Sequence, residues 1–354
     1  MLVQFSTSPC GKLAESRRIH GIPLTFPLFF VHFFSRLWNA TYAIIRLIIT
    51  RIFFAVFTLA AEGAASMAKH RAHRRRHRRW FLPALVILAA ALFVWWSNTA
   101  LQVTRFDAVF RDLPAGFDGC RAAVISDLHT ASFGQDNQDL YAALEAERPD
   151  YIFLVGDLLD QYRSVPEGYA ASMARALSAI APTYYVTGNH EWALGDVPAL
   201  KRTLADNGVA VLSNQFTALE RNGDTVVLAG IDDPNGYADQ KTPEQVAAEV
   251  YAQYGDPFWV LLAHRNNRFV SQYSLLGADL VISGHAHGGI IRLPFTDGLI
   301  SHDLKLFPSY TAGLYEENGS VLFVTRGLGN SGPSFRLFNR PEVAVLTLHK
   351  EFES

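Results

Sequence analysis

The most informative stretch of the sequence is Ser283-Gly284-His285-Ala286-His287-Gly288-Gly289. It follows an apolar run at residues 278–282, which predicts a short buried strand. Two histidines at positions i and i+2 project to the same side only where the backbone is extended, and flanking glycines let the backbone approach another group closely. Because neutral imidazole is a common metal ligand, the stretch indicates either a metal site at a strand end or two polar residues in a surface loop.

Four further apolar runs upstream also end in polar turns, two of which contain glycine. They lie at residues 122–126, Tyr151–Val155, Thr183–Val186 and 259–263, with helical patterns such as Gln138–Glu147 and Tyr169–Ile180 between them. This alternation predicts a soluble α/β domain of about 250 residues that begins near Arg105. Catalytic groups of such domains usually lie on the loops at the strand ends.

Polar side chains that can bind metal follow each of these strands. They are Asp127, His129, Asp157, Asn189, His190, His264, His285 and His287. Carboxylate, amide and imidazole donors suit manganese, iron or zinc. Asp127 and His129 can bind one ion together, and Asp157 could bridge two ions with its two oxygens. Two metals about 3.5–4 Å apart are a known device for phosphoryl transfer, in which a bridging water becomes the attacking hydroxide and a nearby histidine protonates the leaving oxygen.

Five ordered motifs carry a family resemblance. They are Asp127-Leu128-His129, Gly156-Asp157, Gly188-Asn189-His190-Glu191, His264 and Gly284-His285-Ala286-His287, and over about residues 120–350 they resemble the motifs of the calcineurin-like metallophosphoesterases. Further matches resemble the bacterial membrane-associated phosphodiesterases of the YkuE/YaeI type: Gly230-Ile231-Asp232-Asp233, His287-Gly288-Gly289, Arg326-Gly327-Leu328-Gly329, Arg336-Leu337 and Arg340-Pro341-Glu342. The resemblance implies an α/β fold in which two mixed β-sheets are sandwiched between helices in four layers.

The resemblance also implies a role for each site residue and a cofactor of two divalent metal ions, manganese, iron or zinc. It implies that Asp127, His129 and His287 hold the first ion, that Asn189, His264 and His285 hold the second, and that Asp157 bridges them. It further implies that His190 is the general acid and orients the scissile phosphate. Glu191 stands where many family members have aspartate, and either carboxylate could orient His190.

Three residues are weaker candidates for substrate binding: Arg265, Asn266 and Arg326. Arg265 and Asn266 follow His264 where this branch often has a proline-containing turn. The alternative for Arg265 is a solvated arginine at the rim of the site. Asp232 and Asp233 precede Pro234-Asn235-Gly236, so we expect them to form a turn.

Charge divides the 354-residue chain in two. Residues 1–100 carry a net charge of +11 and residues 101–354 a net charge of −13. An acidic main domain argues against a nucleic-acid substrate in a broad basic groove, but bound metal could still attract a phosphorylated substrate. The two cysteines, Cys10 and Cys120, form no cluster, so the sequence indicates neither a disulfide framework nor a zinc–cysteine site. We expect Cys120 to be buried.

We predict four segments. Residues 1–66 form an apolar extension interrupted by arginines, which could lie in a membrane interface, span it poorly or be absent if translation starts at Met67. Residues 67–80 form a basic cytoplasmic segment and residues 81–100 a transmembrane anchor. No charge occurs in the 25 residues between Arg79 and Arg105, which is long enough to span a bilayer. Residues 101–354 form the catalytic domain.

The basic segment predicts the topology, because Lys and Arg next to a span stay in the cytoplasm. We therefore expect a single-pass protein of a bacterial inner or cell membrane with its catalytic domain on the outer side. Arg78-Arg79-Trp80-Phe81-Leu82 resembles a twin-arginine export signal. No small-x-small cleavage site follows, so we favour a retained anchor over a removed signal peptide.

The sequence thus predicts a membrane-anchored, dinuclear metal-dependent phosphoesterase. We favour a phosphodiester or pyrophosphate bond in a lipid or envelope-linked substrate, with no nucleic acid and no obligate protein partner. One alternative is a UDP-2,3-diacylglucosamine hydrolase, which would need a cytoplasmic active site. Another is a metal-binding scaffold without activity, although all the expected ligand positions are filled. A purple-type phosphatase is disfavoured because Tyr162 lies five residues past Asp157 rather than three.

Overall fold

The computed structural model describes residues 74–237, 240–293, 298–301, 305–332 and 335–352, with side chains from Phe81 onward. The predictions for residues 1–66 and for residues 67–73 of the basic segment lie outside the described residues. Cys120 is buried, as expected, and burial raises the pKa of its thiol to about 12.

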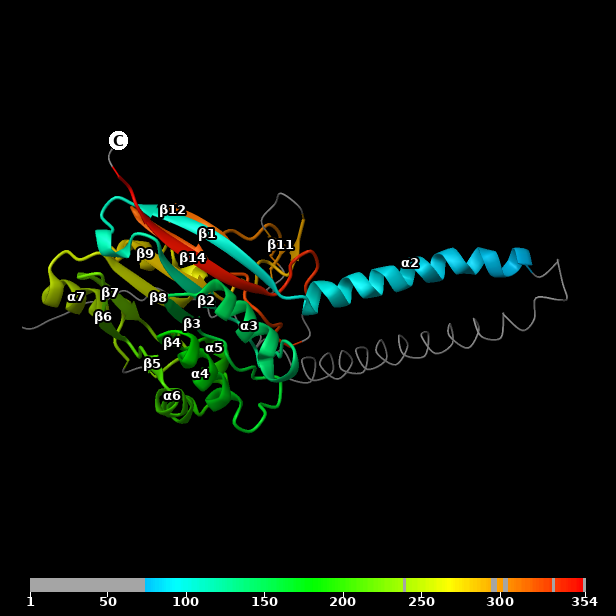
Figure 1. Cartoon of the computed structure of the whole chain (residues 1–354), viewed down its shortest axis with the longest axis horizontal. Coiled ribbons are helices and arrows are strands. Elements are labelled where there is room, and N and C mark those ends of the chain that lie inside the picture. The colour runs from blue at the N-terminus through cyan, green and yellow to red at the C-terminus, as the bar shows by residue number, and fades with distance from the viewer. Residues whose placement is uncertain (1–73, 238–239, 294–297, 302–304, 333–334, 353–354) are drawn as a thin grey trace, which may run out of the picture. The chain divides into compact units, whose positions relative to one another are not determined.

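The described part of the domain contains two six-stranded mixed sheets (Figure 1). The first has the order β1 (Gln102–Phe110), β14 (Glu342–Lys350), β2 (Cys120–Ile125), β3 (Tyr151–Val155), β4 (Thr183–Val186) and β5 (Val209–Val211). The second has the order β12 (Gly313–Glu317), β13 (Ser320–Val324), β9 (Leu280–Gly284), β8 (Trp259–Arg265), β7 (Asp224–Gly230) and β6 (Gln215–Arg221). Strands β10 (Ile291–Arg292) and β11 (Gly298–Ile300) pair antiparallel and form a small hairpin.

Three apolar clusters arrange these elements in four layers. One cluster lies between the two sheets and includes Val124, Phe153, Val260 and Ile282. A second packs helices α3 (Gln138–Glu147), α4 (Tyr169–Ile180) and α6 (Val197–Asp206) on the outer face of the first sheet. A third packs α7 (Pro243–Tyr254) on the outer face of the second sheet. The predicted fold class, two mixed sheets between helices, is therefore confirmed.

Strand direction decides where the loops meet. In the first sheet β2, β3, β4 and β5 run parallel, and in the second β7, β8, β9 and β13 run parallel. The carboxyl ends of parallel strands lie at one edge of their sheet, and the loops that follow them meet there. All five metallophosphoesterase-like motifs lie at the carboxyl ends of strands of these two parallel sets.

One helix precedes the domain. Helix α2 spans Arg74–Thr99, and its segment Phe81–Thr99 is long and apolar enough to cross a membrane. Only 6% of the most apolar window is buried, so this helix presents its apolar side chains outward instead of forming part of the core. The predicted anchor thus falls on a helix of suitable length, and its boundaries within the membrane stay a prediction.

Asp279, just before β9, carries a stability cost that depends on pH. Its Oδ2 accepts a hydrogen bond from the Trp259 backbone N–H at 2.7 Å. Burial raises the pKa of Asp279 from 3.8 to about 6, because it disfavours the charged form. The folded state therefore holds the proton more tightly than the unfolded chain. The free energy of unfolding therefore falls as pH rises from 3.8 to about 6, and the full cost of burying the ionised carboxylate is present above about pH 6.

Asp279→Asn keeps an oxygen acceptor for Trp259 but removes the charge. We expect it to raise the free energy of unfolding at pH 7.5 by an amount on the order of 1 kcal/mol once partial exposure is allowed for, and to raise the midpoint temperature accordingly. Near pH 4 we expect almost no change. Thermal unfolding at the two pH values, followed by tryptophan fluorescence, checks this, and an equal shift at both would contradict the assignment.

Candidate metal centre

The predicted site residues gather where the parallel strands end. Asp127 and His129 follow β2, and Asp157 follows β3. Asn189 and His190 are the first residues of α5 (Asn189–Leu194), which comes after β4. His264 is the second-last residue of β8, and His285 and His287 follow β9. Several have unusual backbones, since Asp127, His129, Asp157, His285 and His287 lie in the left-handed region with φ between 47° and 66°. Few non-glycine residues adopt this conformation, and such strain clusters at functional sites.

Two glycines lie where no side chain would fit. A Cβ atom on Gly188 would come within 2.2 Å of Asp157 Oδ1, and one on Gly284 within 1.9 Å of Ser126 Oγ. These glycines allow the loops to approach each other as closely as the sequence predicted.

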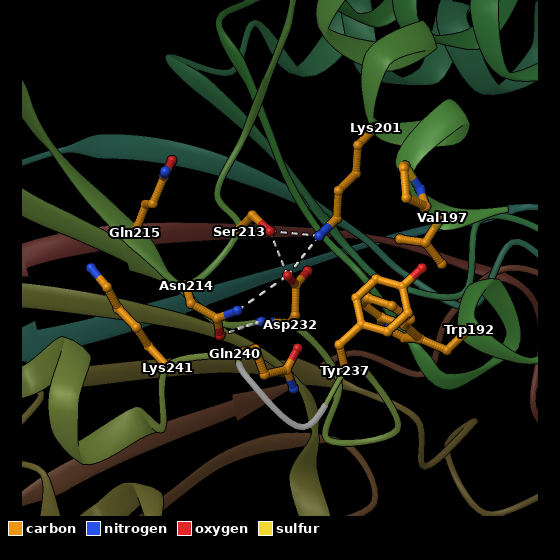
Figure 2. A pocket seen from close by; sticks show the side chains of 11 residues that line it. Trp192, Val197, Lys201, Ser213, Asn214, Gln215, Asp232, Tyr237, Gln240 and Lys241 are labelled. Atoms are coloured by element: carbon orange, nitrogen blue, oxygen red, sulfur yellow. Dashed lines mark hydrogen bonds and ion pairs between the residues drawn. The ribbon is translucent and has the colours of Figure 1, made fainter. Parts of the chain in front are cut away.

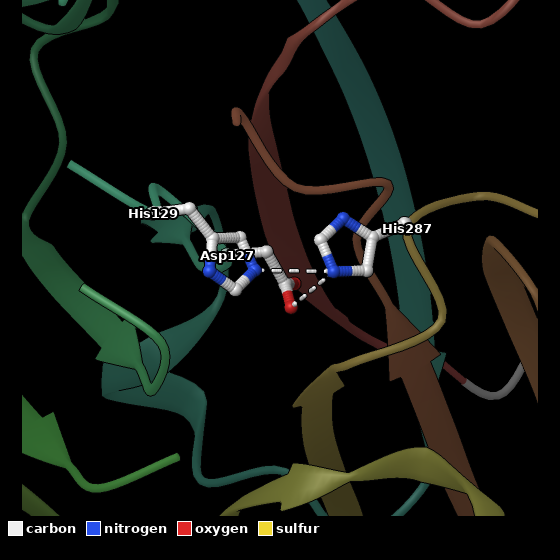
Figure 3. Close-up of side chains that lie close together, drawn as sticks. All are labelled: Asp127, His129 and His287. Carbon is white, nitrogen blue, oxygen red and sulfur yellow. Dashed lines mark hydrogen bonds and ion pairs between the residues drawn. The ribbon is translucent and has the colours of Figure 1, made fainter. Parts of the chain in front are cut away.

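Asp127, His129 and His287 form the first cluster, with one ligand atom from each within 4.8 Å of the others. His287 Nε2 lies 3.2 Å from His129 Nε2 and 3.4 Å from Asp127 Oδ1 (Figure 3). The two rings are nearly parallel, with an interplanar angle of 15°. The His285 backbone N–H donates to the Asp127 carboxylate, at 3.1 and 3.0 Å from its two oxygens, which fixes that side chain.

Asp157, His264 and His285 form the second cluster under the same distance limit. His264 Nε2 lies 3.2 Å from Asp157 Oδ2. The opposite ring nitrogen, Nδ1, donates to the Val155 carbonyl at 2.8 Å. That hydrogen bond sets the orientation of the imidazole and turns Nε2 toward the carboxylate, as is usual for metal-binding histidines.

Asp157, a member of the second cluster, also lies close to the first. Its Oδ2 is 3.7 Å from His129 Nε2 and 3.2 Å from His264 Nε2, while its Oδ1 accepts a hydrogen bond from the His190 backbone N–H at 2.9 Å. The carboxylate is 1% exposed. One of its oxygens thus faces side chains from both sheets, which is the placement that a bridging ligand requires.

The charges of this centre depend on one another. Burial raises the pKa of Asp157, but the surrounding imidazoles, His264 first, outweigh it and hold that pKa well below its ordinary value. Burial lowers the pKa of His264, but Asp157 outweighs it and raises that pKa to about 10. Burial lowers the pKa of His129 well below its ordinary value. The Asp157 carboxylate is therefore ionised at neutral pH although it is buried.

Unsatisfied atoms show that the donor set fits a cation. Apart from its ion pair with Asp157, His264 Nε2 is buried without a hydrogen-bond partner among the described residues, and the buried Asn189 Oδ1 has none there at all. Buried polar atoms without partners are rare and costly, and a metal ion would satisfy both. Asn189 also lies between Gly188, which packs against Asp157, and His190, whose backbone binds the same carboxylate. The residues present therefore fit bound divalent metal, and Asn189 would add a ligand atom to the second cluster.

His190 has a partner that the sequence analysis missed. Its Nδ1 lies 3.2 Å from Asp160 Oδ1, and its Nε2 lies 4.0 Å from Asp157 Oδ2. Burial lowers the pKa of His190, but the hydrogen bond to the fully buried Asp160 and nearby negative charges outweigh it and raise the pKa above its ordinary value. His190 is thus held near the centre with its protonated form favoured.

Glu191 does not contact His190 in the way the sequence suggested. Its Oε2 accepts from the backbone N–H groups of Asp157 and Gly188, and its Oε1 accepts from that of Leu159. Burial raises the pKa of Glu191 to about 7. Glu191 therefore ties the loop after β3 to the start of α5, and Asp160 holds the imidazole instead.

The three weaker candidates all have partners within the protein. The Arg265 guanidinium forms an ion pair with Asp233, with Nε 2.6 Å from Oδ2. Arg326 forms an ion pair with Glu342, with Nη2 2.7 Å from Oε1. Asn266 is buried and donates to the Tyr310 carbonyl at 2.7 Å. Binding of substrate by Arg265, Asn266 and Arg326 stays a prediction.

A separate pocket of about 360 Å³ lies beside α5 (Figure 2). None of the predicted site residues line it. Lys201 Nζ lies 2.6 Å from Asp232 Oδ2 there, and Ser213 Oγ donates to the same oxygen at 2.5 Å. The expected turn forms at Asp233, whose Oδ1 accepts from the Asn235 N–H, whereas Asp232 anchors Lys201.

Comparison with known proteins agrees with this geometry. Residues 120–289 match the family model described as calcineurin-like phosphoesterase. The chain is 28% identical to the uncharacterized metallophosphoesterase YkoQ of Bacillus subtilis, over 74% of this chain and 97% of that protein. It is 27% identical to the uncharacterized metallophosphoesterase YkuE of the same organism, over 67% of this chain and 81% of that protein.

A mammalian relative also matches. The transmembrane protein with metallophosphoesterase domain of Bos taurus is 28% identical, over 70% of this chain and 56% of that protein. The matched family model includes all eight predicted site residues, from Asp127 to His287. The match supports a hydrolase of phosphoester bonds.

Proposed function

We propose, on the premise that this chain carries a calcineurin-like metallophosphoesterase domain, that it is a dinuclear metal-dependent phosphodiesterase anchored in a membrane. The observation that carries the proposal is the position of Asp157. This buried carboxylate lies within 4 Å of imidazole nitrogens from both clusters. A diester or pyrophosphate substrate is favoured over a monoester by the branch resemblance in the motifs.

Each cluster has a proposed part in holding metal. Asp127, His129 and His287 would hold one ion, Asn189, His264 and His285 the other, and Asp157 both. When bound, the ions supply Lewis acidity, which lowers the pKa of a water and neutralises charge on the phosphate oxygens. The identity of the ions is proposed only as manganese, iron or zinc. A proton on His264 Nε2 would compete for the same position, so we expect binding to release protons.

His190 is proposed as the general acid that protonates the leaving oxygen. Nδ1 faces the Asp160 carboxylate in an ion pair, and Nε2 is the nitrogen that faces the centre, so Nε2 would carry the transferable proton. His190 Nε2 also lies 3.2 Å from Ser331 Oγ. An imidazolium here would also orient a phosphate oxygen by charge and hydrogen bonding.

The membrane side of the proposal rests on α2 and on the basic residues before it. We propose that Phe81–Thr99 spans the membrane, with the catalytic domain outside the cytoplasm and a lipid or envelope-linked phosphate as substrate. Neither nucleic acid nor an obligate protein partner is part of the proposal. A topology reporter fused after Ser354 tests the side, and a cytoplasmic signal would reopen the UDP-2,3-diacylglucosamine hydrolase alternative.

The proposed chemistry is tested with the full chain in detergent, stripped of metal and reloaded with manganese, zinc or iron. We expect metal-dependent hydrolysis of bis-p-nitrophenyl phosphate that exceeds hydrolysis of p-nitrophenyl phosphate. Preference for the monoester would overturn the diesterase assignment. Two bound ions without turnover of either compound would favour the scaffold alternative.

A further inference from the structure

The end of the apolar helix is bonded to the segment behind the metal centre. Asn98, in the last turn of α2, accepts from the Arg336 backbone N–H at 2.7 Å and donates to the Arg336 carbonyl at 2.9 Å. Arg336 is 1% exposed, and its Nη2 lies 3.4 Å from His287 Nδ1. Arg336 therefore contacts both the last turn of the candidate span and His287, a proposed metal ligand.

Aromatic contacts bring the same segment alongside the helix itself. The rings of Phe338 and Phe93 have centroids 4.9 Å apart, and the Arg340 guanidinium lies 4.7 Å from the centroid of Trp96. Phe93 precedes Thr99, the last residue of α2, by six residues, which at a rise of about 1.5 Å per residue places it roughly 9 Å inside the helix. Phe338 therefore packs beside the apolar part of α2, and not only at its C-terminal end.

The β10–β11 hairpin continues this surface. The Arg292 N–H donates to the Leu337 carbonyl at 3.0 Å, and the Leu337 N–H donates to the Ile290 carbonyl at 3.1 Å. On the other side of the hairpin the Phe307 N–H donates to the Leu299 carbonyl at 2.9 Å. The segment at 335–338, the hairpin and the turn at 305–307 thus form one connected unit beside α2.

This unit carries several exposed apolar side chains. We define the apolar rim as Leu293, Leu306, Phe307, Phe335 and Phe338, whose exposed fractions lie between 38% and 72%. Phe307 and Phe338 also have left-handed backbones, with φ of 51° and 54°. Such a conformation favours glycine or asparagine over a bulky side chain. Phe307 and Phe338 are therefore exposed on strained turns, and exposed apolar side chains of this kind often mark a contact surface.

We infer that the apolar rim inserts into the bilayer beside α2, so that the metal centre faces the membrane surface and takes a phosphate carried by a lipid headgroup. This inference rests on the proposed function, since it places the proposed phosphoesterase centre at the membrane. A bilayer is the occupant that fits, because the rim is continuous with a helix whose own apolar surface is almost wholly uncovered. Lys305, exposed next to Leu306, would face anionic headgroups.

The depth of the rim can be measured on the full chain. Leu306→Cys and Leu275→Cys would be made in a Cys10→Ser, Cys120→Ser background, labelled with a nitroxide and reconstituted in vesicles of phosphatidylcholine and phosphatidylglycerol. The two positions are matched, since Leu306 is 67% and Leu275 66% exposed. Leu275 ends the short helix Tyr273–Leu275 before β9, at the opposite end of the sheet from His285.

We expect the ratio of collisions with oxygen to collisions with a water-soluble nickel chelate to be at least about five times higher at Leu306 than at Leu275, because oxygen concentrates in the bilayer. Equal ratios would overturn insertion of the rim. Low accessibility to both reagents at Leu306 would indicate a protein contact there and would overturn it as well.

A second measurement tests the source of the phosphate. Phosphatidic acid in the vesicles and soluble glycerol 3-phosphate, at equal total concentration, would compete with bis-p-nitrophenyl phosphate. We expect the lipid to raise the apparent KM at least about ten times more than the soluble phosphate, and the Leu306→Ser, Phe307→Ser variant to lose this difference with kcat unchanged. Equal competition would overturn the lipid source. Absence of any hydrolysis would instead count against the proposed function. The nitroxide measurement would still test whether the apolar rim inserts into the bilayer.

Discussion

Asp157→Asn is expected to abolish nearly all metal-dependent phosphodiester hydrolysis, with kcat lower by at least about a thousand-fold, or roughly 4 kcal/mol of transition-state stabilisation. Asp157 is the only residue in the described part of the chain whose carboxylate lies within 4 Å of nitrogens from His129, His190 and His264 together. An amide keeps the size of the side chain and an acceptor for the His190 N–H, but it removes the charge shared by the two clusters. We therefore expect the variant to fold and to bind fewer than two ions.

The matched control is Asp232→Asn. Asp232 is also a buried carboxylate, 6% exposed, with a hydrogen-bonding network of its own, but it pairs with Lys201 and belongs to neither cluster. It is expected to cost stability while the metal content per folded chain is retained. Steady-state hydrolysis and elemental analysis of both variants make the comparison. If Asp157→Asn kept two ions and its activity, Asp157 could not be the shared ligand.

His190→Gln is expected to have an effect that depends on the leaving group. A general acid contributes about 10²–10⁴-fold where the leaving oxygen needs a proton. We therefore expect kcat for a diester with an alkyl leaving group to fall by at least about a hundred-fold. The loss should be much smaller for bis-p-nitrophenyl phosphate, since p-nitrophenolate departs readily as an anion. The metal content should stay at the wild-type value, because His190 is not proposed as a ligand.

Asp160→Asn serves as the control for the protonation state of His190. The hydrogen bond to Asp160 is the largest of the influences that raise the pKa of His190. A general acid must be protonated, so activity falls as pH rises through that pKa. Removing the Asp160 charge should therefore shift the alkaline side of the pH–activity profile to lower pH. If His190→Gln slowed both diesters equally, or if Asp160→Asn left the alkaline side of the profile unchanged, His190 would be assigned to phosphate binding alone.

Much of the fold could be predicted because local signals agreed with one another. The apolar runs before Asp127, Asp157 and Asn189 became buried parallel strands, and the helical patterns 138–147 and 169–180 became α3 and α4. The strand ends that carry ligands could also be recognised, since each combines an apolar run with a metal-binding side chain close to its end. The pairing of β1 with β14 was not, because it joins residues about 240 apart and no local pattern specifies it.

The site residues that sequence analysis missed act through contacts between distant loops. Asp160 lies three positions after Asp157, and this spacing could have suggested a role, but only the fold shows that its carboxylate reaches His190. Glu191 was expected at that imidazole and instead caps the start of α5. Arg336 was quoted only as a family match, and its burial between α2 and His287 depends on segments far apart in the sequence.

The proposed function depends above all on two metal ions bound at the strand ends. Elemental analysis of the full chain, purified in detergent, equilibrated with manganese, zinc or iron and freed of loosely bound ions, measures this directly. We expect two ions per chain for at least one of these metals, fewer than two in Asp157→Asn and two in Asp232→Asn. A chain that binds one ion or none with every metal, or keeps both ions without Asp157, would contradict the proposed function.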